Sequence, residues 1–451
     1  MAERIWIRNP LAVFTANTED AAGGFVVEGG TIAELVPAGR EPQTCWGSVF
    51  DAGAHVVLPG LVNTHHHFYQ TLTRAWRPVV NVPLFPWLVN LYPVWARLTP
   101  EALRLATKAA LAELLLSGCT TAADHHYLFP AGMEDSVDVQ VEVVRELGMR
   151  AMLTRGSMTL GEDDGGLPPQ RVVQSPEVIL EDSERLIGRY HERGPGAQIQ
   201  IALAPCSPFS VTPEIMKDSA ALAESHDVRL HTHLAETIDE EQFCLERFGL
   251  RTVDYLENVG WLGPRTWLGH GIHFNDDEVA RLGAAGIGVA HCPSSNMRLA
   301  SGICRAVELE DAGVHVGIGV DGSASNDGSN MILEAKQALY LQRLRYGAEL
   351  ATPERALGWA TKGSALALGR TDIGEIAVGK QADLAFFTLD GLRFSGSHDP
   401  LSALLLCGAD RADRVMVGGR WRVIDGRVEG LDLDGLIADH SAAACQLLAE
   451  A

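Results

Sequence analysis

Residues 55–67 read HVVLPGLVNTHHH, an apolar run of strand length that ends in three consecutive histidines. Side chains two residues apart lie on the same side of an extended chain. His65 and His67 can therefore share one metal ion, because imidazole nitrogens are good ligands for Zn²⁺ and for neighbouring first-row metals. An isolated pair of this kind is more often part of a solvent-exposed loop, so a metal site requires further ligands elsewhere in the chain.

Apolar runs of strand length continue through the middle of the chain and alternate with segments of helical character. The further runs are residues 119–124, 149–154, 199–204, 228–234, 266–271, 287–292 and 314–320, and the helical candidates include 100–117, 176–193, 213–225 and 331–346. This alternation favours parallel strand pairing, and eight such units predict a closed (β/α)8 barrel, an α/β fold. In that fold the reactive groups lie at the carboxyl ends of the strands.

The two ends of the chain resemble each other more than either resembles the middle. Residues 24–36 and 415–428 each place β-rich runs around a Gly-Gly or Asp-Gly turn signal, and residues 374–389 predict another pair of short strands. We therefore expect a small discontinuous β-sandwich built from residues 1–58 and 373–430. The barrel is expected over 59–372 and a helical tail over 431–451.

The fifth predicted strand ends at His231-Thr232-His233 and is followed by Glu236. We predict His233 as a third metal ligand and expect His231 to pack or to donate a hydrogen bond behind the ligands. Glu236 suits a proton shuttle, because a partly buried carboxylate near a cation can exchange protons with water and substrate. The alternative role for Glu236 is that of an acid in the first turn of a helix.

The sixth strand carries Gly269-His270-Gly271, and the eighth ends at Asp321. Small neighbours leave room for His270 to face the cavity and polarise the substrate. Asp321 can bind the metal and accept a proton; an isolated aspartate at a strand end is usually a cap or a turn former, and its co-occurrence with the histidines decides between the two. Lysine is absent from residues 199–210, so a bridging lysine for a second metal has no candidate there, and one divalent ion per subunit is predicted.

The formal net charge of −22 makes contact with a phosphate backbone unfavourable, so nucleic acid is not an expected partner. The eight cysteines are scattered without a CxxC pair, which fits reduced thiols in a cytoplasm. No segment approaches the roughly 18 uncharged apolar residues that a membrane span needs. We expect a soluble cytoplasmic protein with a small-molecule partner.

Five stretches follow one another along the chain: PGLVNTHHHFYQ, HTHLAE, GHGIHF, HCPSSN and GVDGSASND. They resemble the amidohydrolase superfamily, and more narrowly its branch of guanine, cytosine, triazine and nucleoside deaminases. The resemblance spans the barrel and both end segments. It implies one metal, most often Zn²⁺ with Fe²⁺ or Mn²⁺ as alternatives, and a hydrolytic deamination. It also implies the same ligands and proton-handling residues as the strand ends: His65, His67, His233 and Asp321 for the metal, and Glu236, His270 and Asp321 for catalysis.

Other stretches, among them ADHHYLFP and APCSPFSVTPE, are most similar to 8-oxoguanine deaminases, which convert 8-oxoguanine to urate and ammonia. Arg155 matches the nucleoside deaminases, but Leu167 stands where they carry a second arginine, which disfavours a ribosyl substrate. Cys206 stands where guanine deaminases have arginine and nucleoside deaminases have histidine. We expect substrate contacts from Arg155 and Cys206, an amide that reads a ring edge at Gln70, and a pocket wall at Trp76.

Two alternatives stay open at this point. The same metal centre could deaminate guanine, isocytosine or an aminotriazine, because pocket residues alone separate these substrates. A catalytically silent barrel that serves as a scaffold is the alternative from another class. Members of the family commonly assemble, so a homo-oligomer is expected.

Overall fold

Eight parallel strands close into one barrel in the computed structural model, which describes residues 4–449. The strands are β7 (Leu61–Asn63), β8 (Cys119–Asp124), β9 (Arg150–Ser157), β10 (Ile199–Pro205), β11 (Arg229–Leu234), β12 (Thr266–His270), β13 (Gly288–His291) and β14 (His315–Ile318). The last strand pairs with the first through Ile318 and Asn63, which closes the ring. The predicted (β/α)8 fold is confirmed.

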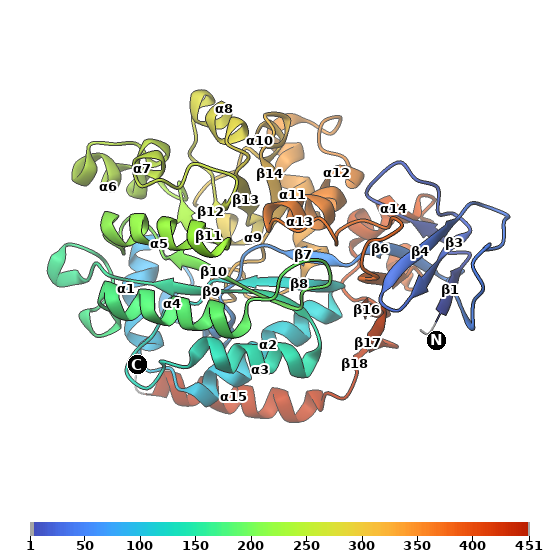
Figure 1. Cartoon of the computed structure of the whole chain (residues 1–451), viewed down its shortest axis with the longest axis horizontal. Helices are drawn as coiled ribbons and strands as arrows, with labels where there is room; N and C mark the ends of the chain where they lie inside the picture. Colours follow the sequence, from blue (N-terminus) through green and yellow to red (C-terminus); the bar gives the residue numbers. More distant parts are fainter. Residues whose placement is uncertain (1–3, 450–451) are drawn as a thin grey trace.

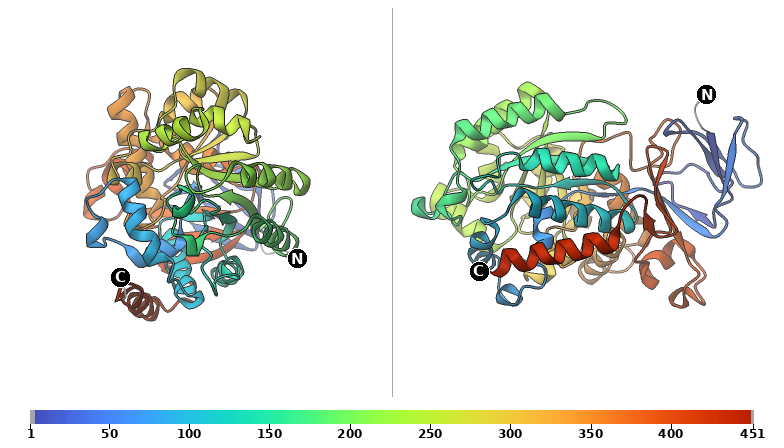
Figure 2. Two further views of the ribbon diagram at one scale, coloured as in Figure 1. Left: turned by 90° about the vertical axis from the view of Figure 1, so that its left-hand side faces the viewer. Right: turned by 90° about the horizontal axis from the view of Figure 1, so that it is seen from below.

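Helices surround the barrel on its outside (Figure 2). They are α2 (Pro100–Leu116), α3 (Ser136–Leu147), α4 (Pro176–Tyr190), α5 (Pro213–His226), α6 (Ile238–Phe248), α7 (Thr252–Asn258), α8 (Asp276–Ala284), α9 (Pro293–Arg298), α10 (Ala306–Asp311), α11 (Met331–Tyr346), α12 (Pro353–Gly358) and α13 (Ser364–Ala367). Thr99 and Ser175 cap α2 and α4 by accepting a backbone N–H of the first turn, and each helix begins with proline. Local sequence signals therefore set where these helices begin.

The first apolar run is divided between two sheets. We expected one strand over residues 55–62, but β6 (His55–Pro59) pairs with β15 (Leu384–Thr388) outside the barrel, and β7 begins after Gly60. A Cβ at Gly60 would lie 2.2 Å from the Thr120 hydroxyl oxygen. The chain can pass this point only with glycine, and both halves are apolar because both are buried.

Strands from both ends of the chain form two further sheets at one end of the molecule (Figure 1). One has the order β4-β3-β1-β5 and the other β18-β17-β16-β15-β6-β2. Phe25, Val27 and Phe386 belong to a core that both sheets share. Of the two strands expected within residues 374–389 only β15 forms, because the preceding residues make a single isolated bridge. The remaining strands are β1 (Arg4–Arg8), β2 (Ala12–Val13), β3 (Gly24–Glu28), β4 (Thr31–Val36), β5 (Ser48–Asp51), β16 (Arg414–Val417), β17 (Arg420–Ile424) and β18 (Arg427–Val428).

The opposite end of the molecule is covered by the segment between β7 and α2. This segment forms the 3-10 helix η1 (Phe68–Thr73) and the helix α1 (Leu84–Trp95), which Figure 1 shows at the end away from β1, β3 and β4. Its apolar side chains share a core with Phe209 from the loop after β10. The segment forms a roof over the carboxyl ends of the barrel strands.

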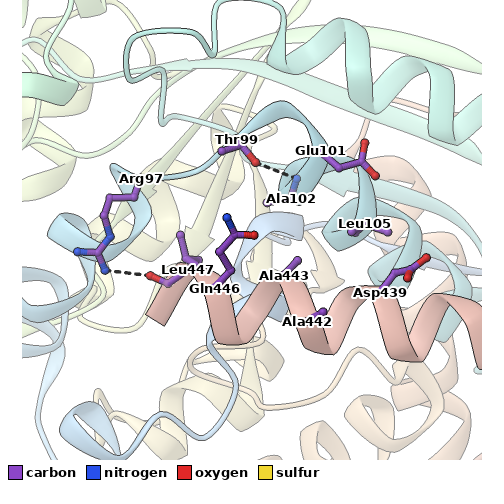
Figure 3. Close-up of a pocket in the computed structure, with 10 residues that line it drawn as sticks. All are labelled: Arg97, Thr99, Glu101, Ala102, Leu105, Asp439, Ala442, Ala443, Gln446 and Leu447. Atoms are coloured by element: carbon purple, nitrogen blue, oxygen red, sulfur yellow. Dashed lines mark hydrogen bonds between the residues drawn. The ribbon is translucent and has the colours of Figure 1, made fainter. Parts of the chain in front are cut away.

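The chain ends in a long helix, α15 (Leu433–Ala449), which packs against α2 and η1. An Arg97 guanidinium N–H donates to the carbonyl of Leu447 over 3.0 Å at the groove between α15 and α2 (Figure 3). The ring of His440 hydrogen-bonds to the Thr71 hydroxyl over 3.0 Å. The tail expected over 431–451 includes residues 450–451, which lie outside the described residues. Within residues 4–449, no helix has both the length and the apolar character needed to cross a bilayer.

Candidate metal centre and active site

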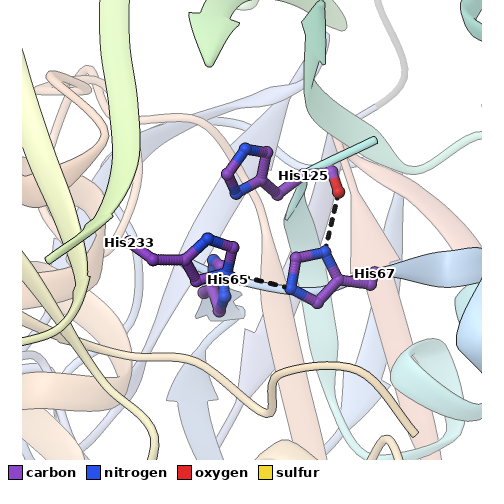
Figure 4. A group of neighbouring side chains, drawn as sticks. All are labelled: His65, His67, His125 and His233. Carbon is purple, nitrogen blue, oxygen red and sulfur yellow. Dashed lines mark hydrogen bonds between the residues drawn. The ribbon is translucent and has the colours of Figure 1, made fainter. Parts of the chain in front are cut away.

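The four predicted metal ligands meet at the carboxyl end of the barrel. Asp321 Oδ1 lies 3.4 Å from His65 Nε2 and 3.3 Å from His67 Nε2. The Nε2 atoms of His67 and His233 lie 3.2 Å apart (Figure 4). All four side chains are buried. Residues separated by more than 250 positions thus present their ligand atoms to one point.

Hydrogen bonds to backbone carbonyls orient two of these imidazoles. His67 Nδ1–H donates to the carbonyl of His125 over 2.7 Å, and His233 Nδ1–H donates to the carbonyl of Cys206 over 2.6 Å. A neutral imidazole that donates from Nδ1 carries its lone pair on Nε2. Two lone pairs only 3.2 Å apart repel each other unless a cation lies between them. The pair is therefore suited to bind a metal ion.

A hydrogen-bond relay through His231 orients His65. His231 Nδ1–H donates to the carbonyl of Trp267 over 2.8 Å, so its Nε2 accepts from His65 Nδ1–H over 2.8 Å. The lone pair of His65 is then on Nε2, which faces Asp321. We expected His231 to pack or to donate behind the ligands; it lies behind them, but it accepts the hydrogen bond from His65 and donates to the backbone.

The charges of these groups suit a divalent cation. Burial lowers the pKa of His65 and His233 well below the usual histidine value, which favours neutral rings. Burial alone would raise the pKa of Asp321, but the neighbouring side chains of His65 and His67 hold it well below the usual value. Ser295 Oγ–H also donates to Asp321 over 2.6 Å. Neutral imidazoles beside one carboxylate form a donor set typical of Zn²⁺ and similar ions.

His125 also belongs to the group of imidazoles and was not given a role in the sequence analysis. Its ligand-capable nitrogen lies within 4.8 Å of those of His65, His67 and His233. Its ring stacks on His233 with centroids 4.7 Å apart, and its Nε2–H donates to the carbonyl of Ala204. The His-His pair after the second barrel strand was the signal in the sequence that could have identified it.

Glu236 and His270 face the same space beside the ligands. His270 Nε2 lies 3.5 Å from Glu236 Oε2 and 3.8 Å from Asp321 Oδ2, while its Nδ1–H donates to Asn296 over 3.0 Å. Burial raises the pKa of Glu236, which favours a carboxyl that can carry a proton. Burial would lower the pKa of His270, but Glu236 and Asp321 raise it above its usual value. The two side chains can therefore hold and pass protons.

Three residues at these strand exits have a strained backbone. Ala235, His270 and Asp321 have φ angles of 54°, 69° and 62°, a left-handed conformation that costs residues with a Cβ roughly 1–3 kcal/mol each. The Glu240 carboxylate accepts the backbone N–H groups of Ala235 and Glu236 over 3.0 and 2.9 Å. These contacts hold the strained turn that points Glu236 into the cavity.

A cavity opens over the predicted ligands. Its lining residues are His67, Gln70, Leu84, Trp87, Leu88, Tyr92, Tyr127, Cys206, Phe209, His233, Glu236 and Asp321. The structure thus brings the predicted Gln70 and Cys206 to the cavity wall. The Gln70 Oε1 atom makes no hydrogen bond among the described residues, and burial raises the pKa of the Cys206 thiol to about 12.

The aromatic wall differs from the one expected. Trp76 is partly buried against the roof core and is not among the lining residues, whereas Trp87 on α1 does line the cavity. Trp87 Nε1–H donates to the carbonyl of Ala324 over 3.3 Å, which fixes its indole. Sequence reasoning missed α1 as a wall because the position of this helix depends on tertiary packing.

The structure does not bring Arg155 to the cavity. Its Nε–H donates to Asp182 on α4 over 2.6 Å and its Nη2–H to Gln174 over 2.9 Å. The guanidinium also lies 3.8 Å from the ring centroid of Phe129. Alternation along β9 turns Arg155 towards the surrounding helices, so a contact with substrate is not supported.

Arg155→Leu is expected to lower the free energy of unfolding by about 2–4 kcal/mol, because Asp182 and Gln174 lose their hydrogen bonds to a buried guanidinium. KM should stay near the wild-type value. Urea unfolding measures the free energy of unfolding, and steady-state kinetics measure KM. Arg104→Leu is the matched control; Arg104 pairs with Glu142 at the surface, so its loss should cost less than about 1 kcal/mol. A changed substrate preference at unchanged stability would contradict this interpretation of Arg155.

A sequence model of the amidohydrolase family matches residues 56–422. The chain belongs to the amidohydrolase family. An 8-oxoguanine deaminase from Pseudomonas aeruginosa is 78% identical over 446 residues, which covers 99% of each chain. An isoxanthopterin deaminase from an unknown prokaryotic organism is 35% identical and covers 89% of this chain and 88% of its own.

Solved structures of amidohydrolases agree with this assignment. The atrazine chlorohydrolase of Arthrobacter aurescens TC1, determined in complex with zinc, superimposes with a TM-score of 0.91 at 32% identity and covers 98% of this chain and 100% of its own. The predicted family and the predicted hydrolase, a metal-dependent amidohydrolase that acts on carbon–nitrogen bonds, are confirmed.

Proposed function

We propose that this amidohydrolase removes the 2-amino group of 8-oxoguanine by hydrolysis, which yields urate and ammonia. The observation that carries the proposal is the 78% identity, over nearly the whole of both chains, to a relative named 8-oxoguanine deaminase. The cavity supports it, because its walls are mainly apolar and aromatic, a lining against which a flat heterocyclic base can pack.

His65, His67, His233 and Asp321 would hold the metal. A divalent cation supplies Lewis acidity, which lowers the pKa of water and makes a nucleophile available near neutral pH. We propose one Zn²⁺ per subunit, with Fe²⁺ or Mn²⁺ as alternatives. The zinc in the related atrazine chlorohydrolase and the proposed three-nitrogen, one-oxygen donor set support this choice.

The other polar groups of the cavity would move protons during the reaction. Asp321 accepts the proton that the attacking water loses as the new C–O bond forms at C2. Glu236 donates a proton to the ring nitrogen beside C2, so that the ring can accept an electron pair, and the N–H of His270 stabilises the charge on the new oxygen. The C–N bond then breaks, Asp321 returns its proton to the departing amine, and Glu236 takes the hydroxyl proton. Ammonia and urate result.

Ammonia release from four bases tests the substrate. We expect kcat/KM to be highest for 8-oxoguanine and lower for guanine, isocytosine and an aminotriazine. The reason is that a site built to hydrogen-bond one substrate leaves its own polar groups unpaired with the others. Faster turnover of guanine than of 8-oxoguanine would overturn the assignment.

Metal removal tests the alternative of a silent scaffold. Dialysis against a chelator is expected to abolish ammonia release, and added Zn²⁺, Fe²⁺ or Mn²⁺ should restore it. Purified protein that stays inactive on all four bases after each metal is added would support the scaffold instead.

We also propose the domain division, assembly and location expected from the sequence. The sandwich would comprise residues 1–58 and 373–430, with the barrel between them and the helical tail after them. The shared core of the two end sheets supports the sandwich. Assembly as a homo-oligomer and a cytoplasmic location are expected; sedimentation velocity would test the first and cell fractionation the second.

A further inference from the structure

One polar group of the cavity has no part in the proposed proton transfers. Tyr92 lies on α1, is 1% exposed and lines the cavity. Among the described residues its hydroxyl makes no hydrogen bond of normal geometry. The thiol of Cys206 lies beside this hydroxyl, but a thiol forms only weak hydrogen bonds. A buried hydroxyl without a partner costs about 1–3 kcal/mol, so a bound ligand is an attractive partner for it.

Tyr92 belongs to the roof of the cavity and not to the metal end. The other lining tyrosine, Tyr127, makes ring contacts with His67 and His125 at centroid distances of 5.2 and 5.3 Å. The ring contact recorded for Tyr92 is with Trp95 on the same helix, at 6.1 Å. Because α1 forms the roof, Tyr92 faces a bound ligand from the roof side of the cavity.

The proposed reaction determines which part of the base faces Tyr92. The amine at C2 must lie at the metal end, and the two fused rings are rigid, so C8 points to the roof. Along α1 the other lining residues are Leu84, Trp87 and Leu88, and the indole N–H of Trp87 already donates to Ala324. Tyr92 is the side chain of this helix that can donate a hydrogen bond at C8.

We propose that Tyr92 determines specificity by donating its hydroxyl hydrogen to the C8 carbonyl oxygen of 8-oxoguanine. The inference rests on the proposed function. Guanine carries C–H at this position and would leave the hydroxyl unpaired. A site built to hydrogen-bond a substrate rejects an analogue that lacks the partner by about 10⁴-fold or more in the strongest cases. Burial raises the pKa of Tyr92 well above its usual value, which keeps the hydroxyl protonated as a donor.

Tyr92→Phe tests the proposal because it removes the hydroxyl and keeps the ring. We expect kcat/KM for 8-oxoguanine to fall about 10- to 100-fold while that for guanine stays within about threefold. Calorimetric titration with the two products is a second measurement. Binding of urate, which has an oxygen at C8, should weaken by a similar factor, and binding of xanthine, which lacks it, should not.

Tyr255→Phe is the matched control. Tyr255 on α7 is also buried with an unpartnered hydroxyl, but it does not line the cavity. Both substrates should be turned over by this variant as by the wild type. If Tyr92→Phe changes both substrates equally, or neither, in an active enzyme, the inference is overturned and the proposed function stands. If wild-type protein does not deaminate 8-oxoguanine, both the proposed function and the inference about Tyr92 are wrong.

Discussion

Glu236→Gln is expected to lower the turnover of 8-oxoguanine by about 10³- to 10⁴-fold, because an amide can neither accept nor release the proton that the ring nitrogen needs. Glu236 Oε2 lies 3.5 Å from His270 Nε2, to one side of the four ligands. Metal content should therefore stay at the wild-type level. Single-turnover kinetics with metal analysis of the same preparation separates these two effects.

Glu278→Gln is the control for replacing a buried carboxylate by an amide. Glu278 is buried on α8, accepts hydrogen bonds from Arg251, and does not line the cavity. This variant should lose stability while its turnover stays near that of the wild type. Near wild-type turnover in Glu236→Gln would refute the proton-shuttle role.

His67→Asn is expected to lower metal affinity by more than about 100-fold, because even residues behind metal ligands contribute 10- to 100-fold. His66→Asn should retain the metal. The His66 ring points away from the ligands, and its Nε2 hydrogen-bonds to Ser329 over 2.9 Å. Both variants replace a histidine by asparagine at neighbouring positions. They differ only in the side of the chain on which the replaced ring lies.

Metal stoichiometry by emission spectroscopy and unfolding in urea measure the two outcomes. We expect His66→Asn to cost about 1–3 kcal/mol of stability through the lost hydrogen bond to Ser329. His67→Asn should lose activity together with metal. Equal metal loss in both variants would contradict the assignment of His65 and His67 as ligands on one side of the chain.

The metal centre was predictable because it depends on strand geometry. His65 and His67 share a side of the chain, and the barrel brings the carboxyl ends of all eight strands to one face. Asp321 is a partial exception. It follows β14 by three residues and reaches the ligands through a left-handed turn that no periodicity indicates.

The substrate contacts were less predictable, because they depend on how separate elements pack. Gln70 follows the ligands closely and does reach the cavity, but Arg155 points outwards to Asp182. Trp76 and Trp87 lie in one connecting segment and look equivalent in the sequence, yet only Trp87 reaches the cavity. The packing of the roof determines which aromatic side chain lines the cavity.

By itself the sequence determined the barrel and the family and predicted the ligand set, since strand alternation, strand ends and motifs can be read directly along the chain. Only the tertiary structure decided the division of the first apolar run at Gly60, the direction of the hydrogen bond between His65 and His231, and the placement of Tyr92 in the roof. Each of these depends on contacts between residues far apart in sequence, where burial and packing, not local pattern, choose the partner.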